Sequence, residues 1–246
     1  MAGLNASPAM CDFEQVTHLT FDCYGTLIDW ETGILESLMP LLNRSRAAIT
    51  EEQLLRQYVQ YEAEEESGPY KPYREILANI SAHIGDSLGM HLNHDERSIL
   101  PNSVGDWPPF SDSITALGRL KKRYKLVIVS NIDDSLFAAT QRTLGVHFDE
   151  IVTAEQVRSY KPSPNHFAET TARLKVPKEQ ILHVAQSIYH DLVPARSFGL
   201  SMVRINRWSR LAGLGLALPA PVTPKLELPD LASLSDLLIP RADQEL

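Results

Sequence analysis

The chain has 246 residues, 43% of them hydrophobic, which is enough for one large α/β domain with an insertion or for a core domain with a small cap. A formal net charge of −8 and a pI near 5.5 argue against nucleic acid or an anionic membrane surface as a partner. Two cysteines, Cys11 and Cys23, suggest neither a disulfide framework nor a thiolate metal site. No apolar run reaches the length of a membrane span and residues 1–12 do not look like a signal peptide, so we expect a soluble cytoplasmic protein.

The first apolar segment, residues 16–21, has the pattern of a buried β-strand and leads into Asp22, which is followed by a tight turn at Gly25 and Thr26. Open α/β sheets carry their functional groups at the carboxyl ends of strands. A carboxylate at such a strand end can act as a nucleophile or bind a metal ion. The structural alternative is an Asp that only caps the turn.

Helical patterns follow over residues 31–45, 50–67, 73–90 and 95–104. The second begins with a capping-box pattern, in which Thr50 is followed three residues later by Gln53. The Pro-rich segment 106–110 then marks the return from a helical insertion to the core.

From residue 111 onward, helices and strands alternate. The expected order is helix 111–123, strand 125–130, helix 133–144, strand 150–153, helix 164–174, strand 181–185, helix 192–198 and strand 201–205, with a final segment at 231–239. This alternation predicts the α/β class, with a mostly parallel, doubly wound sheet covered by helices on both faces. Residues 208–229, which contain several Gly and Pro residues, are expected to form a long connection, either on the surface or over the strand ends as a lid.

Polar side chains follow three of the later strands and helices. Ser130 and Asn131 end a strand, where they could bind an anionic oxygen, or where Asn131 could merely turn the chain. Lys161 lies in a Pro-rich segment and is either a charge partner for Asp22 or an ordinary surface lysine. Asp191 follows the strand at 181–185. It is either a functional residue at the strand end or only a cap of the next helix.

Four short motifs stand in one order along the chain: Asp22-Cys23-Tyr24-Gly25-Thr26, Ser130-Asn131, Tyr160-Lys161-Pro162 and Gln186 to Asp191. In this order they resemble the four motifs of the haloacid dehalogenase (HAD) superfamily, and the resemblance extends from about residue 16 to residue 238. It implies a Rossmann-like HAD core made of residues 1–29 and 106–246, a helical cap inserted at residues 30–105, and a possible homodimer.

Within this superfamily, Tyr24 and Gln186 favour the 2-haloacid dehalogenases. The phosphatases carry an Asp general acid where this chain has Tyr24, and an Mg²⁺-binding Asp where it has Gln186. An alkoxide leaving group needs a proton and a halide does not, so a Tyr suits dehalogenation. Because Mg²⁺ prefers carboxylates, no metal or other cofactor is expected. The chain also departs from the dehalogenases, which have Ser at the position of Gln186, Asn at that of Ile188 and Tyr at that of Phe167.

The resemblance assigns roles to four residues as catalytic groups. Asp22 would be the nucleophile, Lys161 would keep it ionised, and Asp191 would assist the water that cleaves the resulting ester. In the cap, Arg56 would receive the halide together with Asn131, in a stretch otherwise rich in glutamates that are expected to form mostly a solvated face.

Other residues are expected to bind substrate or to pack. Ser130 with backbone amides would hold the substrate carboxylate, Tyr24 would shape the pocket, and Gln186 would contact substrate. His183 is expected to be a core residue, and His190 a lesser candidate for substrate contact. The alternatives to Arg56 as halide acceptor are Arg44, Arg46 and Arg74.

The sequence therefore predicts metal-independent hydrolytic dehalogenation of a small 2-haloalkanoic acid through an aspartyl ester. Two alternatives stay open. One is a Mg²⁺-dependent HAD phosphatase or related hydrolase, and the other is a catalytically divergent member acting on an anionic metabolite.

Overall fold

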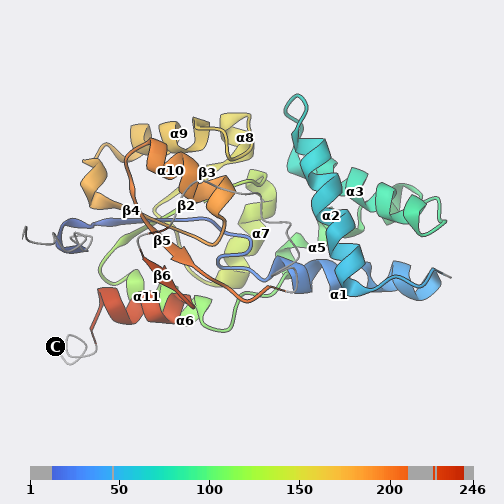
Figure 1. The fold of residues 1–246 in the computed structure, drawn as a ribbon, viewed down its shortest axis with the longest axis horizontal. Coiled ribbons are helices and arrows are strands. Elements are labelled where there is room, and N and C mark those ends of the chain that lie inside the picture. The colour runs from blue at the N-terminus through green and yellow to red at the C-terminus, as the bar shows by residue number, and fades with distance from the viewer. Residues whose placement is uncertain (1–12, 46, 210–223, 225, 241–246) are drawn as a thin grey trace, which may run out of the picture.

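The computed structural model describes residues 13–45, 47–209, 224 and 226–240. At its centre lies a parallel sheet with the strand order β3-β2-β1-β4-β5-β6 (Figure 1). The strands are β1 (His18–Phe21), β2 (Lys125–Ser130), β3 (Glu150–Thr153), β4 (Ile181–Ala185), β5 (Ser201–Ile205) and β6 (Glu227–Leu228). The chain adds strands first on one side of β1 and then on the other, so the predicted doubly wound α/β class is confirmed.

The central strands are covered on both faces, which explains their nearly unbroken apolar sequences. Leu19 and Phe21 of β1 are fully buried, and so is β2 from its second residue to its last. The helices α9 (Asn165–Leu174) and α10 (Val193–Ser197) cover one face. The helices α6 (Ser113–Leu120) and α11 (Leu231–Leu238) cover the other (Figure 1). The bounds predicted for β2, β3, β4 and β5 agree with the structure.

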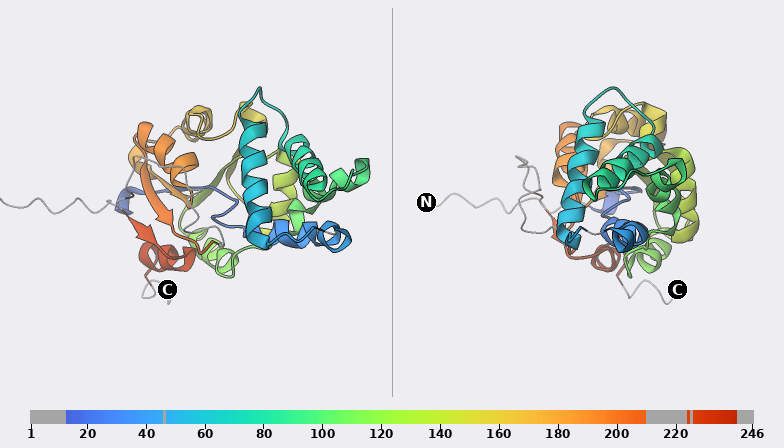
Figure 2. Two further views of the ribbon diagram at one scale, coloured as in Figure 1. Left: turned by 45° about the vertical axis from the view of Figure 1, so that its right-hand side comes forward. Right: turned by 90° about the vertical axis from the view of Figure 1, so that its right-hand side faces the viewer.

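The segment between β1 and β2 is helical. It contains α1 (Trp30–Arg44), α2 (Glu51–Glu66), α3 (Tyr73–Ser87), α4 (His94–Arg97) and α5 (Ile99–Ser103), followed by the 3-10 turn η2 (Val104–Asp106). These helices lie together beyond the carboxyl ends of the strands, as the left view of Figure 2 also shows. The capping box at Thr50 and Gln53 is confirmed, whereas the cap boundaries at residues 30 and 105 stay a prediction.

The single helix predicted at 95–104 is wrong, because the chain forms α4 and α5 with a break at Ser98. Pro101 lacks a backbone N–H and is tolerated in the first turn of a helix, where α5 places it, but not in the interior of a longer one.

Several elements of the second half differ from the predicted pattern. The helix α7 (Asp134–Leu144) ends as expected at Gly145, whose φ is +64°. The short helix α8 (Ala154–Val157), the edge strand β6 and the 3-10 turns η1 (Phe13–Gln15) and η3 (Lys178–Gln180) were not predicted. A π-helical turn, η4 (Ile188–Leu192), precedes α10. The connection predicted over residues 208–229 lies largely outside the described residues.

One apolar cluster runs from the sheet into the helical insertion. It joins Phe21 and Ile128 of the sheet to Ile34, Leu54 and Leu77 of α1, α2 and α3. Within the described residues, no helix combines the length and the apolar character needed to cross a lipid bilayer.

A close contact between Gly33 and Trp107 gives a test of this packing. A Cβ at Gly33 would lie 2.3 Å from Cγ of Trp107, which is 3% exposed. We expect Gly33→Ala to lower the free energy of unfolding by about 1–3 kcal/mol through overpacking. Gly118→Ala, in α6 with open space around its Cβ, should instead raise it by about 0.5–1 kcal/mol. Urea denaturation measures both, and equal effects would contradict the packing described.

Candidate active site

Asp22 lies at the point where the strand order of the sheet reverses. It directly follows β1, which pairs with β2 on one side and with β4 on the other, and its N–H donates to the carbonyl of Val184 in β4 (3.1 Å). Ligand sites of open α/β sheets form outside the carboxyl ends of the strands at such a switch point. The carboxylate is 7% exposed, so it can meet a small molecule only within the fold.

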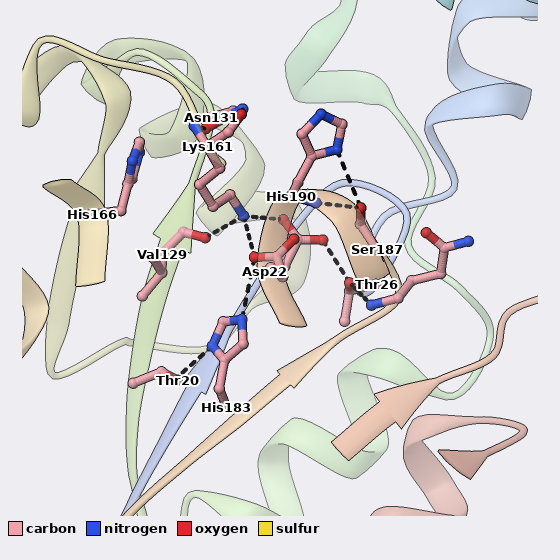
Figure 3. Close-up of polar contacts among 12 residues, drawn as sticks. Thr20, Asp22, Thr26, Val129, Asn131, Lys161, His166, His183, Ser187 and His190 are labelled. Atoms are coloured by element: carbon pink, nitrogen blue, oxygen red, sulfur yellow. Dashed lines mark hydrogen bonds and ion pairs between the residues drawn. The ribbon is translucent and has the colours of Figure 1, made fainter. Parts of the chain in front are cut away.

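Lys161 is buried against two carboxylates. Its Nζ donates to Oδ1 of Asp22 (2.8 Å), to Oδ1 of Asp191 (2.6 Å) and to the carbonyl oxygen of Val129 (2.9 Å), as Figure 3 shows. An ammonium has three N–H donors, and these three contacts use them all. The side chain is 2% exposed, so these charge-assisted hydrogen bonds are shielded from water.

Asn131 fixes the main chain of Lys161. Its Oδ1 accepts the N–H of Lys161 (2.7 Å), and its Nδ2 donates to the carbonyl of the same residue (3.2 Å). Both polar atoms of the amide are therefore engaged. The amide thus holds the main chain of Lys161 in place, and the role of Asn131 in receiving a halide stays a prediction.

The turn after Asp22 orients its second oxygen. Thr26 donates from Oγ1 to Oδ2 of Asp22 (2.6 Å) and accepts the N–H of Gln186 (3.0 Å). Gly25, with φ +91°, makes this tight turn possible without strain. Each oxygen of Asp22 thus has one fixed donor, Lys161 on Oδ1 and Thr26 on Oδ2.

Two side chains, Lys161 and His183, contact the same oxygen of Asp191. Oδ1 accepts from Lys161 and lies 3.2 Å from Nε2 of His183, whose Nδ1 lies 2.9 Å from Oγ1 of Thr20 (Figure 3). Oδ2 is buried and has no hydrogen-bond partner among the described residues. This oxygen is therefore a buried acceptor that receives no hydrogen bond from the described residues.

The charges of this cluster shift its pKa values in different directions. Burial raises the pKa of Asp22, against the opposing effect of Lys161. Burial also disfavours the charged form of Asp191, but Lys161 and His183 outweigh it and hold the pKa of Asp191 at about 2. Burial acts to lower the pKa of Lys161, and the two carboxylates raise it above its usual range. At neutral pH Lys161 is therefore an ammonium and Asp191 a carboxylate.

Two other predicted substrate contacts lie beside the cluster. Ser130, at the end of β2, is 1% exposed, and its hydroxyl has no partner among the described residues. The hydroxyl of Tyr24 hydrogen bonds with Oγ1 of Thr140 in α7 (2.8 Å), and its ring meets that of Trp107 edge-on at 5.7 Å. The Tyr24 hydroxyl is thus turned away from Asp22. Gln186 contributes its main-chain N–H to Thr26.

The structure does not bring Arg56 into the described hydrogen-bonded cluster. Its Nε and Nη2 bind Oε1 of Glu52, one turn earlier on α2, at 3.1 and 3.0 Å. Of the alternatives, Arg44 binds Glu96 (2.6 Å) and Arg74 binds Asn102 (3.2 Å), while Arg46 lies outside the described residues. The predicted transfer of the halide to Arg56 is therefore not supported by its position.

Two glutamates of α2, Glu62 and Glu66, were not predicted as site residues, and they lie off the solvated face of the helix. Oε1 of Glu62 accepts from Tyr58 (3.2 Å) and from Tyr73. Burial and the neighbouring Glu62 raise the pKa of Glu66 well above its usual range, while the charge of Lys161 acts in the opposite direction. The spacing of positions 58, 62 and 66 is a signal that could have placed both on the buried face of Tyr58.

Hydrogen bonds also tie the helical insertion to the strand ends. The N–H groups of Tyr73 and Arg74, at the start of α3, donate to the two oxygens of Asp133 at 2.8 and 2.7 Å. Tyr160 donates to the carbonyl of Lys71 (2.7 Å), and its ring lies 6.2 Å from that of Tyr73. The Asp133 carboxylate binds the N-terminus of α3, and the ring of Tyr160 lies beside that of Tyr73. Since Tyr160 directly precedes Lys161, the insertion lies next to Lys161.

The donor set suits Mg²⁺ poorly. Asp22 and Asp191 are the carboxylates of the cluster, and Lys161 already binds an oxygen of each. In the part of the chain that the structure describes, no group of three or more His, Cys, Asp or Glu side chains is arranged to hold a metal ion. We therefore derive no step through a metal.

The comparisons with known proteins find relatives and solved structures that resemble this chain over most of its length. The (S)-2-haloacid dehalogenase 1 of Pseudomonas sp. (strain CBS-3) is 24% identical over 195 residues, which cover 76% of this chain and 83% of the relative. The L-2-haloacid dehalogenase structure from Xanthobacter autotrophicus superposes with a TM-score of 0.77 at 21% identity, covering 91% of this chain and 98% of the other. The HAD-hydrolase YfnB from Bacillus subtilis, bound to magnesium, has a TM-score of 0.71 at 18% identity, over 91% and 98%.

The profile of one family matches most of the chain. It covers residues 16–199, from the start of the first strand region through the last of the four motifs. The chain belongs to the haloacid dehalogenase-like hydrolases.

Proposed function

We propose that this hydrolase cleaves the carbon–halogen bond of a small 2-haloalkanoic acid through an ester on Asp22, without a metal ion. The observation that carries the proposal is the Lys161 ammonium shared by Asp22 and Asp191 inside the fold. The relatives named as 2-haloacid dehalogenases support it.

In the first step, a carboxylate oxygen of Asp22 attacks the halogen-bearing carbon. A carbon–oxygen bond forms, the carbon–halogen bond breaks, and the halide leaves with the bonding electron pair. The halide needs no proton, which agrees with a Tyr24 hydroxyl that is turned toward Thr140. Lys161 and Thr26 fix the attacking carboxylate, and such orientation can supply about 7–11 kcal/mol of the barrier.

In the second step, water attacks the carbonyl carbon of the Asp22 ester. The open oxygen Oδ2 of Asp191 accepts a proton from this water, and Lys161 stabilises the negative charge that develops on the ester oxygen. Collapse of the tetrahedral intermediate frees the 2-hydroxy acid. The 2-hydroxy acid leaves with the second proton of the water, Asp22 is again a carboxylate, and the proton on Asp191 returns to solvent.

The substrate carboxylate would be received by neutral donors. The Ser130 hydroxyl is one, and the protonated form of Glu66, which its raised pKa favours, is another. A protonated carboxyl donates one hydrogen bond to an anion, whereas an ionised carboxylate repels it. Glu66 would thus join Ser130 in binding the substrate carboxylate.

The magnesium-dependent alternative rests on one comparison, because YfnB shares the fold and was crystallised with magnesium. A homodimer and a cytoplasmic location also stay predictions, as does action on another anionic metabolite.

Removing the nucleophile tests the proposal. Asp22→Asn should lower halide release from a panel of 2-haloacids by about 10⁴-fold or more, and excess chelator should leave the unmodified protein unaffected. Halide is measured with an ion-selective electrode, and mass spectrometry maps any adduct to Asp22. Asp95→Asn, at an exposed position of α4, is the matched control. Activity that disappears with chelator would favour the magnesium alternative, and no halide from any acid would remove the dehalogenase proposal.

The acid limb of the pH profile reports on Asp22. Burial raises its pKa above 3.8, so Asp22 becomes protonated and non-nucleophilic at a higher pH than an ordinary Asp. We expect kcat/KM for halide release to be constant above that raised pKa and to fall as the pH drops through it. Circular dichroism at each pH checks that the protein is still folded. A rate that stays constant down to pH 4 would contradict a buried, ionised nucleophile.

Glu66 should control how KM depends on pH. Below its raised pKa the side chain is neutral, and above it the carboxylate repels an anionic substrate, so KM should increase as the pH rises. Glu66→Gln is neutral at every pH and should abolish this increase. Glu64→Gln, on the exposed face of the same helix, should retain it. The same KM profile in both variants would exclude a contact between Glu66 and the substrate carboxylate.

A further inference from the structure

His183 is a polar residue in the middle of the sheet that the proposed reaction does not use. It belongs to β4, is fully buried, and packs edge-on against Phe167 with ring centroids 5.0 Å apart. Its two nitrogens face Thr20 of β1 and Asp191 of η4. A buried imidazole is costly unless both nitrogens are paired, and an apolar residue would serve the strand equally well.

The neighbours of His183 determine which nitrogen carries the hydrogen. Asp191 is ionised, so its Oδ1 can only accept, and Nε2 must be the donor across the 3.2 Å contact. In the tautomer that carries its hydrogen on Nε2, Nδ1 is an acceptor, and the hydroxyl of Thr20 donates to it at 2.9 Å. Hydrogen bonds therefore run in one direction, from Thr20 through His183 to Asp191.

We propose that His183 is a positioning residue for the hydrolysis of the Asp22 ester, because its Nε2–H and the Lys161 ammonium together hold Oδ1 of Asp191 and leave the buried Oδ2 without a hydrogen bond, as the acceptor for the proton of the attacking water. This inference rests on the proposed function. His183 keeps its own proton throughout, and the proton of the water goes to Oδ2 of Asp191. With Lys161 as the single donor to Oδ1, the Asp191 carboxylate could rotate, and Oδ2 would no longer face the water.

The proposal separates the two chemical steps. Asp22 is oriented by Lys161 and Thr26, neither of which contacts His183, so formation of the ester does not depend on the imidazole. Hydrolysis of the ester does depend on the imidazole, because this step needs Oδ2 of Asp191 in a fixed orientation. A residue that served only to pack β4 would affect both steps through the stability of the sheet.

Single-turnover kinetics on the full chain with a 2-haloacid distinguish these cases. In His183→Phe we expect the burst of halide to stay within about twofold of normal, while hydrolysis of the ester slows about 10- to 100-fold, so that the mass of the Asp22 adduct accumulates. His183→Gln places an amide N–H donor near the position of Nε2 and should recover most of the hydrolysis rate. Thr20→Val should slow the same step and Thr20→Ser should not.

Several outcomes would overturn the proposal. Normal ester hydrolysis in His183→Phe would do so, and so would an equal loss in both steps that the glutamine variant does not rescue. A readout independent of substrate is the ¹⁵N NMR spectrum of the imidazole, for which we expect the Nε2–H form. A hydrogen on Nδ1 would contradict the hydrogen-bond direction. Absence of halide release from every haloacid in the unmodified protein would instead remove the proposed function, and this inference with it.

Discussion

The structure depends on a single ammonium group that two buried carboxylates share. Burying ions is costly, and it is tolerated here because all three donors of Lys161 are paired. One positive charge between two negative charges leaves an excess of one negative charge in a site with little water. Esterification of Asp22 would remove that excess, so the surroundings that strain the free anion would favour its conversion to the ester.

The rest of the fold supplies the rigidity that this arrangement requires. Strand ends of a parallel sheet are held by neighbours on both sides, and β1 places Asp22 between β2 and β4. Asn131 then clamps the main chain of Lys161. Each residue of the cluster thus has a further hydrogen-bonding partner: Thr26 for the Asp22 carboxylate, Asn131 for the main chain of Lys161 and His183 for the Asp191 carboxylate.

The sequence predicted the strands and the three charged residues well, because strand periodicity and position at strand ends are local signals. It failed where the outcome depends on which neighbour a side chain meets. For Asn131, no pattern shows that its amide binds the main chain of Lys161 thirty residues later. Nor does a pattern show that Arg56 binds Glu52 of its own helix, or that the charge of Lys161 acts on Glu66 of the same helix.

The apolar cluster that continues from the sheet into the helical insertion has a consequence for access to Asp22. Opening a wide cleft between the two would expose residues such as Ile34 and Leu54, at about 25 cal/mol for each Å² of apolar surface. Entry and exit of a reactant therefore favour small local movements of side chains around the strand ends over a large hinge motion. Such movements would admit molecules of a few heavy atoms and exclude bulky ones.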